Sequence, residues 1–249
     1  MKNVLLIFIL VMIYSACFAS ENVHWGYEGH EGPANWGDLS EDFHVCKSGV
    51  SQSPINIDTG DVIKVSMEPI SFSYKTSGVT LVNNGHTLQA NYDRGSYITI
   101  KGQKFELLQF HFHSPSENTV NSNYFDMEAH LVHKSAKGEL AVVSVLLKGR
   151  AENQFLKQFW SAMPDKSGVT RVLNIKFSVM DFLPTNQSYY HFDGSLTTPP
   201  CSEGVHWFVL QNPVSVSKKQ VEAFTTNIIK HNERPTQPVN ARNVLSNPL

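Results

Sequence analysis

The strongest constraint on the fold is a series of short β-branched and aromatic runs between Ile70 and Leu147. Turn signals separate these runs, namely Asn84-Gly85, Asp93-Arg94-Gly95, Lys101-Gly102 and Lys137-Gly138. This spacing is typical of a sheet built from hairpins and meanders. The strand runs do not alternate regularly with helical segments, so there is no sign of a parallel α/β sheet. We therefore predict a mostly β (α+β) fold: a single domain with a central twisted, mostly antiparallel sheet and a few short helices.

Two segments have a helical pattern, Glu152–Met163 and Lys218–His231. The second is the better one, because Ser217 and Gln220 are placed for a capping box. Its apolar side chains at helical spacing are Val221, Phe224 and Ile228.

The segment from Glu21 to Gly60 is rich in Gly, Trp, His and Pro and has no clear period, so we expect irregular coil on the surface. A hydrophobic content of 41% is that of a globular protein with a real core. The formal net charge of −2 is too small to indicate nucleic acid or a membrane surface as an electrostatic partner. Any partner must therefore be identified from a site.

The N-terminus has the pattern of a signal peptide, which we assign to residues 1–20. A lysine starts it, an apolar run follows over residues 4–14, and small side chains precede the cleavage point after Ala19 or the next residue. The run is shorter than the roughly 20 apolar residues of a membrane-spanning helix. The mature domain would then comprise residues 21–249 and be periplasmic or secreted. A retained anchor and a lipid on Cys17 are the alternatives.

The cysteines favour one disulfide. If Cys17 leaves with the signal peptide, only Cys46 and Cys201 are left. An even count in an exported protein indicates a bridge, and two buried free thiols are the alternative.

A first pair of candidate metal ligands lies in the stretch KFELLQFHFHS, Lys104–Ser114. In a strand the side chains alternate between faces, so His111 and His113 share one face and can converge on one ion. The same alternation predicts that Phe105, Leu107 and Gln109 lie on this face too. By itself a His-x-His pair is weak evidence.

The stretch MEAHLVH, Met127–His133, strengthens the prediction. If it pairs antiparallel with the first stretch, His130 completes a three-histidine site, whereas His133 points to the other face and has no metal role. Three neutral nitrogens and one open position are typical of a catalytic zinc ion.

Each of these strands also has a polar residue two positions before a histidine, on the same face: Gln109 before His111 and Glu128 before His130. A ligating imidazole usually donates its second N–H to such a partner, which fixes its orientation.

Further motifs accompany this pattern along the chain. They are HWGYEGHEGPANW (His24–Trp36), QSPINI (Gln52–Ile57), NNGH (Asn83–His86), QFHFHSPSEN (Gln109–Asn118), GSLTTPPCSEGVHW (Gly194–Trp207) and ERPTQPVNAR (Glu233–Arg242). Over nearly the whole mature chain the sequence resembles the α-class carbonic anhydrases. The short loop after His113 and the two-cysteine pattern are more similar to bacterial members than to vertebrate ones.

The resemblance implies a zinc lyase that reversibly hydrates carbon dioxide to bicarbonate and a proton, by attack of a zinc-bound hydroxide. It implies Zn2+ on His111, His113 and His130, with Gln109, Glu128 and the backbone carbonyl of Asn232 as their supporting partners. It also implies a disulfide between Cys46 and Cys201.

The resemblance assigns further roles near the metal. Thr197 and Glu117 match the pair that orients the nucleophile, His86 matches the proton shuttle, and Thr198 lies beside the bicarbonate position. The apolar wall for carbon dioxide is matched by Val132, Val142, Leu196, Val205 and Trp207. Polar groups that hold a water chain are matched by Tyr27, Asn84 and Gln89.

Two positions depart from a common version of the family pattern: Asn118 replaces a frequent His, and Phe192 a frequent Tyr.

The rival functions are a recognition domain, which would have lost zinc ligands, and a zinc peptidase, for which the His-Glu-x-x-His helix is missing. Side activity on small esters fits the same nucleophile, and a homodimer is compatible with the resemblance to bacterial members.

Overall fold

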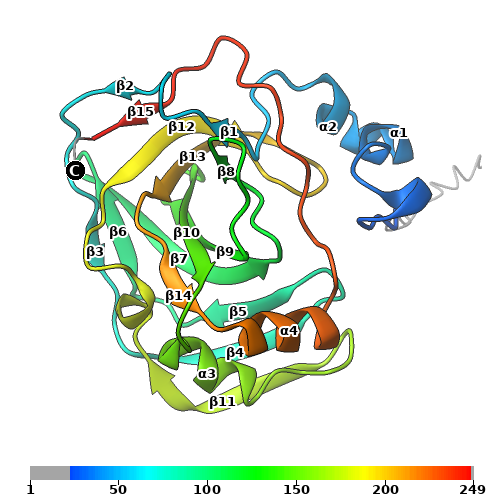
Figure 1. Ribbon diagram of the computed structural model, residues 1–249, viewed down its shortest axis with the longest axis vertical. Coiled ribbons are helices and arrows are strands. Elements are labelled where there is room, and N and C mark those ends of the chain that lie inside the picture. Colours follow the sequence, from blue (N-terminus) through cyan, green and yellow to red (C-terminus); the bar gives the residue numbers. More distant parts are fainter. Residues whose placement is uncertain (1–22, 248–249) are drawn as a thin grey trace, which may run out of the picture.

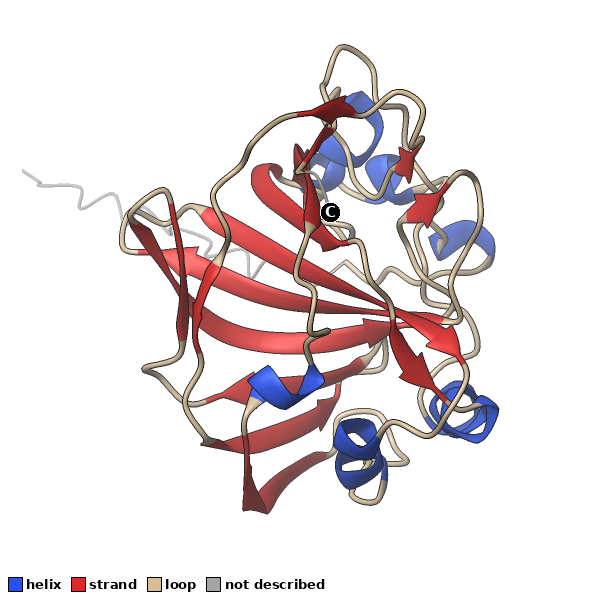
Figure 2. Ribbon diagram, turned by 60° about the vertical axis from the view of Figure 1, so that its left-hand side comes forward, coloured by secondary structure: helices blue, strands red, loops and turns tan. Residues whose placement is uncertain are grey.

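The computed structural model describes residues 23–247, so the signal peptide predicted for residues 1–20 lies outside the described residues. The described part is dominated by strands, with short helices at the periphery (Figures 1 and 2). The strands are β1 (Asn56–Ile57), β2 (Ile63–Lys64), β3 (Ser71–Ser73), β4 (Ser77–Asn83), β5 (Leu88–Tyr92), β6 (Tyr97–Ile100), β7 (Gln103–His113), β8 (Thr119–Val120), β9 (Met127–Ser135), β10 (Leu140–Gly149), β11 (Thr170–Phe177), β12 (Tyr189–Ser195), β13 (Glu203–Leu210), β14 (Val214–Val216) and β15 (Leu245–Ser246).

Thirteen of these strands form one sheet in the order β11-β4-β5-β7-β9-β10-β13-β12-β15-β2, with β6 on β7, β3 on β6 and β14 on β10. Most neighbours are antiparallel; β10 runs parallel to β13 and β14, and β15 runs parallel to β2. The predicted fold class is therefore confirmed. The predicted turns also connect successive strands, and Gly85 and Gly138 adopt the positive φ that these tight turns require.

The sheet is covered on both faces, as the central strand β10 shows. Val143 and Val145 point into a large core beneath the helices, whereas Val142 and Leu146 point into a smaller core on the other face. We call these the helix-side core and the site-side core. A strand buried on both faces is apolar at nearly every position, which is why LAVVSVLL has no alternation and only Ser144, a donor to Glu128, interrupts the run.

One predicted face assignment is wrong because β7 contains a bulge. The register against β9 shifts between Leu107 and Gln109, so Leu108 is an extra residue. The bulge reverses the alternation, and Phe105 and Leu107 join Phe110 in the helix-side core instead of lying beside Gln109.

The helices are α1 (Trp36–Leu39), α2 (Val45–Ser48), α3 (Gln154–Trp160) and α4 (Lys218–Asn227), with 3-10 turns at Gly29–Glu31, Glu41–Phe43 and Val179–Phe182. Both predicted helices exist but are shorter than expected. The capping box of Ser217 and Gln220 is confirmed, and Phe224 on the apolar face of α4 is fully buried. Within the described residues, no helix has the length and apolar character needed to cross a membrane.

The N-terminal segment is more ordered than expected. It contains α1, α2 and β1, and Trp36 and Ile57 are fully buried rather than on the surface. A disulfide joins Cys46 of α2 to Cys201, with 5.0 Å between their Cα atoms, so the predicted bridge is confirmed.

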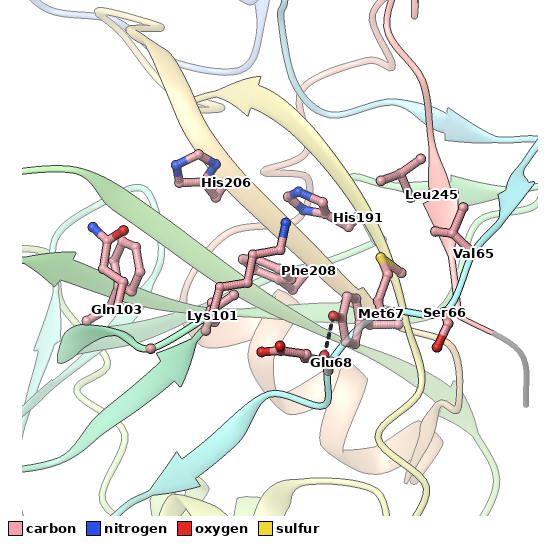
Figure 3. Close-up of a pocket in the computed structure, with 14 residues that line it drawn as sticks. Val65, Ser66, Met67, Glu68, Lys101, Gln103, His191, His206, Phe208 and Leu245 are labelled. Atoms are coloured by element: carbon pink, nitrogen blue, oxygen red, sulfur yellow. Dashed lines mark hydrogen bonds between the residues drawn. The ribbon is translucent and has the colours of Figure 1, made fainter.

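Two hollows lie on opposite faces of the sheet. A cleft of about 760 Å³ opens beside Phe105 and Phe208 of the helix-side core (Figure 3). A smaller hollow of about 140 Å³ lies where His111 and His113 end β7.

We expect the disulfide to stabilise the fold substantially, because it closes a loop between residues 155 positions apart. In the chain-entropy model such a loop contributes about 4–5 kcal/mol to the free energy of unfolding. Denaturant unfolding of the double variant Cys46→Ser/Cys201→Ser should show a loss approaching this size. A reductant should destabilise the parent similarly and leave the double variant unchanged; equal stability of parent and variant would contradict the prediction.

Candidate metal centre

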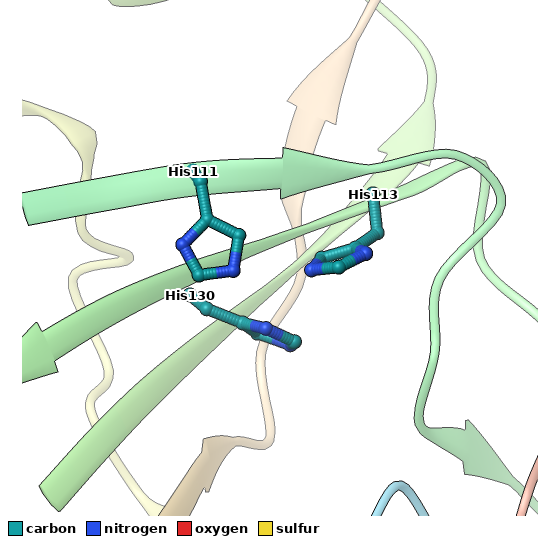
Figure 4. Close-up of side chains that lie close together, drawn as sticks. All are labelled: His111, His113 and His130. Carbon is teal, nitrogen blue, oxygen red and sulfur yellow. The ribbon is translucent and has the colours of Figure 1, made fainter. Parts of the chain in front are cut away.

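The pairing of β7 with β9 brings three histidines together. His111 lies directly opposite His130 in this antiparallel register, and His113 is two residues further along β7. One nitrogen from each ring lies within 4.8 Å of the others (Figure 4).

Each imidazole has its other nitrogen next to an acceptor. His111 Nδ1 donates to Gln109 Oε1 at 2.9 Å, and His113 Nδ1 donates to the backbone carbonyl of Asn232 at 2.7 Å. His130 Nε2 lies 3.0 Å from Glu128 Oε1. The nitrogens that remain are Nε2 of the first two rings and Nδ1 of the third.

The donor set fits a zinc ion. His113 Nε2 is buried and has no hydrogen-bond partner within residues 23–247, which is costly unless another ligand satisfies it. Three convergent imidazoles, two of which line the hollow, leave one coordination position open, as catalytic zinc sites do.

Burial keeps two of the rings in the neutral form that binds metals. It lowers the pKa of His113 to about 3, with a contribution from the neighbouring His130, and lowers the pKa of His111 well below its usual value. For His130 burial is the largest single effect and acts in the same direction, but the charge and hydrogen bond of Glu128 together with the charge of Glu117 raise its pKa.

The Glu128 carboxylate is buried and fully hydrogen-bonded. It accepts the backbone N–H groups of Glu117 and Asn118 and the Asn118 side-chain amide, each at 2.7 Å, and the Ser144 hydroxyl. Burial opposes its charge, but His130 and these donors lower its pKa to about 2. Asn118, the first departure from the family pattern, thus acts as a donor to the carboxylate that orients His130.

Glu117 is also completely buried. Burial raises its pKa to about 7, although His130, the Thr197 hydroxyl and the Arg234 N–H, which donates to Oε1 at 2.8 Å, favour the charged form. Its Oε2 lacks a well-formed hydrogen bond within the described part of the chain, so Thr197 is near but not ideally placed.

Apolar side chains form a wall beside the histidines. Val132, Val142 and Trp207 are directly opposite one another on β9, β10 and β13, and the Trp207 ring lies 4.9 Å from that of His130. Leu196 and Val205 belong to the same site-side core. Phe192, the second departure, stacks parallel to Trp207 at 6.0 Å and extends the wall without a hydroxyl.

The smaller hollow is lined by polar and aromatic side chains: Trp25, Tyr27, Asn84, His86, Thr87, Gln89, Gln109, His111, His113 and Thr198. His86 stacks on Trp25 with 3.9 Å between ring centres. Burial, and then the charge of His24, lower its pKa. Asn84 Oδ1 caps the turn by accepting the N–H groups of His86 and Thr87.

Arg234, in the motif ERPTQPVNAR, is a functional residue that was not predicted from the sequence. Its guanidinium is 1% exposed and donates to Gln52 Oε1 and to the carbonyls of Ser53 and Cys46. It thus ties the N-terminal segment to the backbone that contacts Glu117. The available signal was an arginine between Glu233 and Pro235, within a motif that carries the family resemblance. Nothing in the spacing of residues along the sequence predicted that Trp25 stacks on His86.

Comparison with known proteins agrees with this geometry. The family model for eukaryotic-type carbonic anhydrase matches residues 31–248. A carbonic anhydrase of Klebsiella pneumoniae is 44% identical over 95% of each chain. The α-carbonic anhydrase of Thermovibrio ammonificans, solved with the inhibitor sulfanilamide, is 44% identical, with a TM-score of 0.89 over 90% of this chain and 100% of the other. A dioscorin complexed with ascorbate is 30% identical, with a TM-score of 0.85 over 90% and 97%.

The histidine cluster predicts the metal content of the protein. His113→Ala should lose the zinc bound by the parent, because the site keeps only two of its three nitrogens. Elemental analysis of purified protein gives the zinc content, and the exposed His44→Ala is the matched control that should retain it. A full zinc content in His113→Ala would remove this residue from the site.

Proposed function

Because the chain belongs to the α-class carbonic anhydrase family, we propose that it hydrates carbon dioxide reversibly to bicarbonate and a proton with a zinc ion on His111, His113 and His130. The observation that carries the proposal is the set of three convergent imidazoles, each with its second nitrogen next to an acceptor. When bound, zinc would lower the pKa of a coordinated water to about 7 and so supply a nucleophile at neutral pH.

Gln109, Glu128 and Asn232 would hold the ligands in place. Asn232 is itself clamped, since its side chain accepts the Ser114 N–H and donates to the carbonyls of His86 and Phe112. Such rigidity matters because a displacement of about 1 Å can reduce the rate roughly 100-fold.

Thr197 and Glu117 would orient the nucleophile. In the proposed arrangement Glu117 accepts the Thr197 hydroxyl proton, so the Thr197 oxygen can only accept in turn from the attacking group. This leaves a lone pair of that group directed at the substrate carbon. Support comes from the burial of both residues and from the effect of Thr197 on the pKa of Glu117.

The substrate would lie against the apolar wall. Carbon dioxide is uncharged, so contact with Val132, Val142 and Trp207 costs no desolvation of a charge, whereas the charged product is less well accommodated there. Thr198 lines the hollow beside His111 and His113 and would contact bicarbonate. The same nucleophile would give slow hydrolysis of small esters.

We also propose that the mature chain, residues 21–249, is exported to the periplasm or secreted. The Cys46–Cys201 disulfide supports this, because such bonds persist in oxidising compartments.

Stopped-flow measurement of carbon dioxide hydration tests the function. The parent should be active, lose activity on removal of zinc by a chelator and regain it when zinc is returned. A protein that binds zinc but hydrates no carbon dioxide would contradict the proposal, and a protein that binds neither would support the rival function of a recognition domain, for which the similarity to the ascorbate-bound dioscorin is a precedent.

Thr197→Ala separates orientation from metal binding. The variant should retain zinc and lose roughly 100- to 1,000-fold in kcat, the usual cost of one well-placed catalytic hydrogen bond. Thr226→Ala, an exposed threonine on α4, is the control that should match the parent. An unchanged rate in Thr197→Ala at full zinc content would exclude Thr197 from the mechanism.

His86→Ala tests the proton shuttle. Each turnover releases a proton deep in the hollow, and His86, which lines that hollow and is neutral at pH 7, can accept it. The variant should retain zinc but turn over more slowly in weakly buffered solution, and a small imidazole buffer should restore much of the rate. If the variant matches the parent at low buffer concentration, the proton leaves by another route.

A further inference from the structure

The cleft of about 760 Å³ on the helix-side face contains a second pair of histidines, His191 on β12 and His206 on β13 (Figure 3). His206 is opposite Asp193 in the β12–β13 register, so the two histidines are diagonal neighbours on one face of the sheet. Their ring centres are 6.4 Å apart. The sheet separates this cleft from the histidine cluster, since Trp207, the neighbour of His206 on β13, belongs to the site-side core on the other face.

Both rings have the hydrogen bonding of metal ligands. His191 Nδ1 donates to the carbonyl of Trp207 at 2.9 Å, and His206 Nδ1 donates to Asp193 Oδ1 at 2.7 Å. A carbonyl and a carboxylate can only accept, so both nitrogens carry the proton. Over residues 23–247 neither Nε2 atom makes a hydrogen bond, which leaves two lone pairs beside the cleft. A carbonyl or carboxylate behind the imidazole is the usual support of a metal-bound histidine.

The charges around the pair are mixed. Burial lowers the pKa of His191 and keeps this ring neutral, whereas Asp193, with a smaller effect of Glu139, raises the pKa of His206. A cation therefore competes with a proton on His206. Lys101 extends toward the pair from the β6–β7 turn (Figure 3), and its positive charge opposes a cation.

We propose that this cleft binds a divalent transition-metal ion such as Zn2+ through the Nε2 atoms of His191 and His206. Imidazole is a preferred ligand of zinc, copper and nickel. With bonds of about 2.0–2.1 Å, two ligating rings in a tetrahedral site have centres about 5 Å apart. The two ring centres must therefore move about 1 Å closer to each other than the 6.4 Å in this structure. The His206 side chain is 39% exposed, which allows this movement. Water completes the coordination.

The test is calorimetric titration of the untagged protein, already carrying its tightly bound zinc, with additional Zn2+. The parent should bind one further equivalent. His191→Ala and His206→Ala should each lose it, and Asp193→Asn should weaken it about 10-fold, as loss of a partner behind a ligand does. His44→Ala, an exposed histidine far from the cleft, should bind like the parent, and circular dichroism verifies that each variant is folded.

Lys101→Gln distinguishes a cation site from an anion site, because removing this charge should tighten Zn2+ binding. With Cu2+ as the probe, electron paramagnetic resonance of the parent should show two equivalent nitrogen ligands. The proposal is overturned if the parent binds no further equivalent, if the equivalent persists in His191→Ala/His206→Ala, or if Lys101→Gln weakens it.

Discussion

The antiparallel pairing of β7 with β9 is the constraint on which the site depends. It places His111 opposite His130, and the bulge at Leu108 reverses the alternation within β7. As a result Phe105 and Leu107 enter the helix-side core, while Gln109 and the histidines face the hollow. Without the extra residue, either these apolar side chains or the polar ones would lie on the wrong face.

A buried polar network then keeps the histidines in place. Glu128 is completely buried, and a carboxylate in that position would be strongly destabilising without partners. Two backbone N–H groups, an amide and a hydroxyl compensate by donating to it, and His130 lies against it. Asn118 therefore helps to hold this carboxylate in place, through both its backbone N–H and its side-chain amide.

Loops from distant parts of the chain are held to this sheet by a few strong contacts. The Cys46–Cys201 disulfide and the guanidinium of Arg234 both fasten the N-terminal segment beside the loop that carries Thr197. Arg234 stays charged although burial lowers its pKa to about 10, because each of its bonds is to an oxygen acceptor. The coil expected in this segment is therefore ordered by tertiary contacts and not by local propensity.

The sequence alone determined the strands, their turns, the capped helix α4 and the three histidines with Gln109 and Glu128, because two-residue periodicity and capping are local properties. Only the tertiary structure decided the bulge, the burial of Trp36, the contacts of Arg234 and the stacking of His86 on Trp25. Each of these depends on which residues meet across large sequence separations. Local spacing specifies where a side chain points from its own strand, whereas packing between strands and loops decides what it contacts.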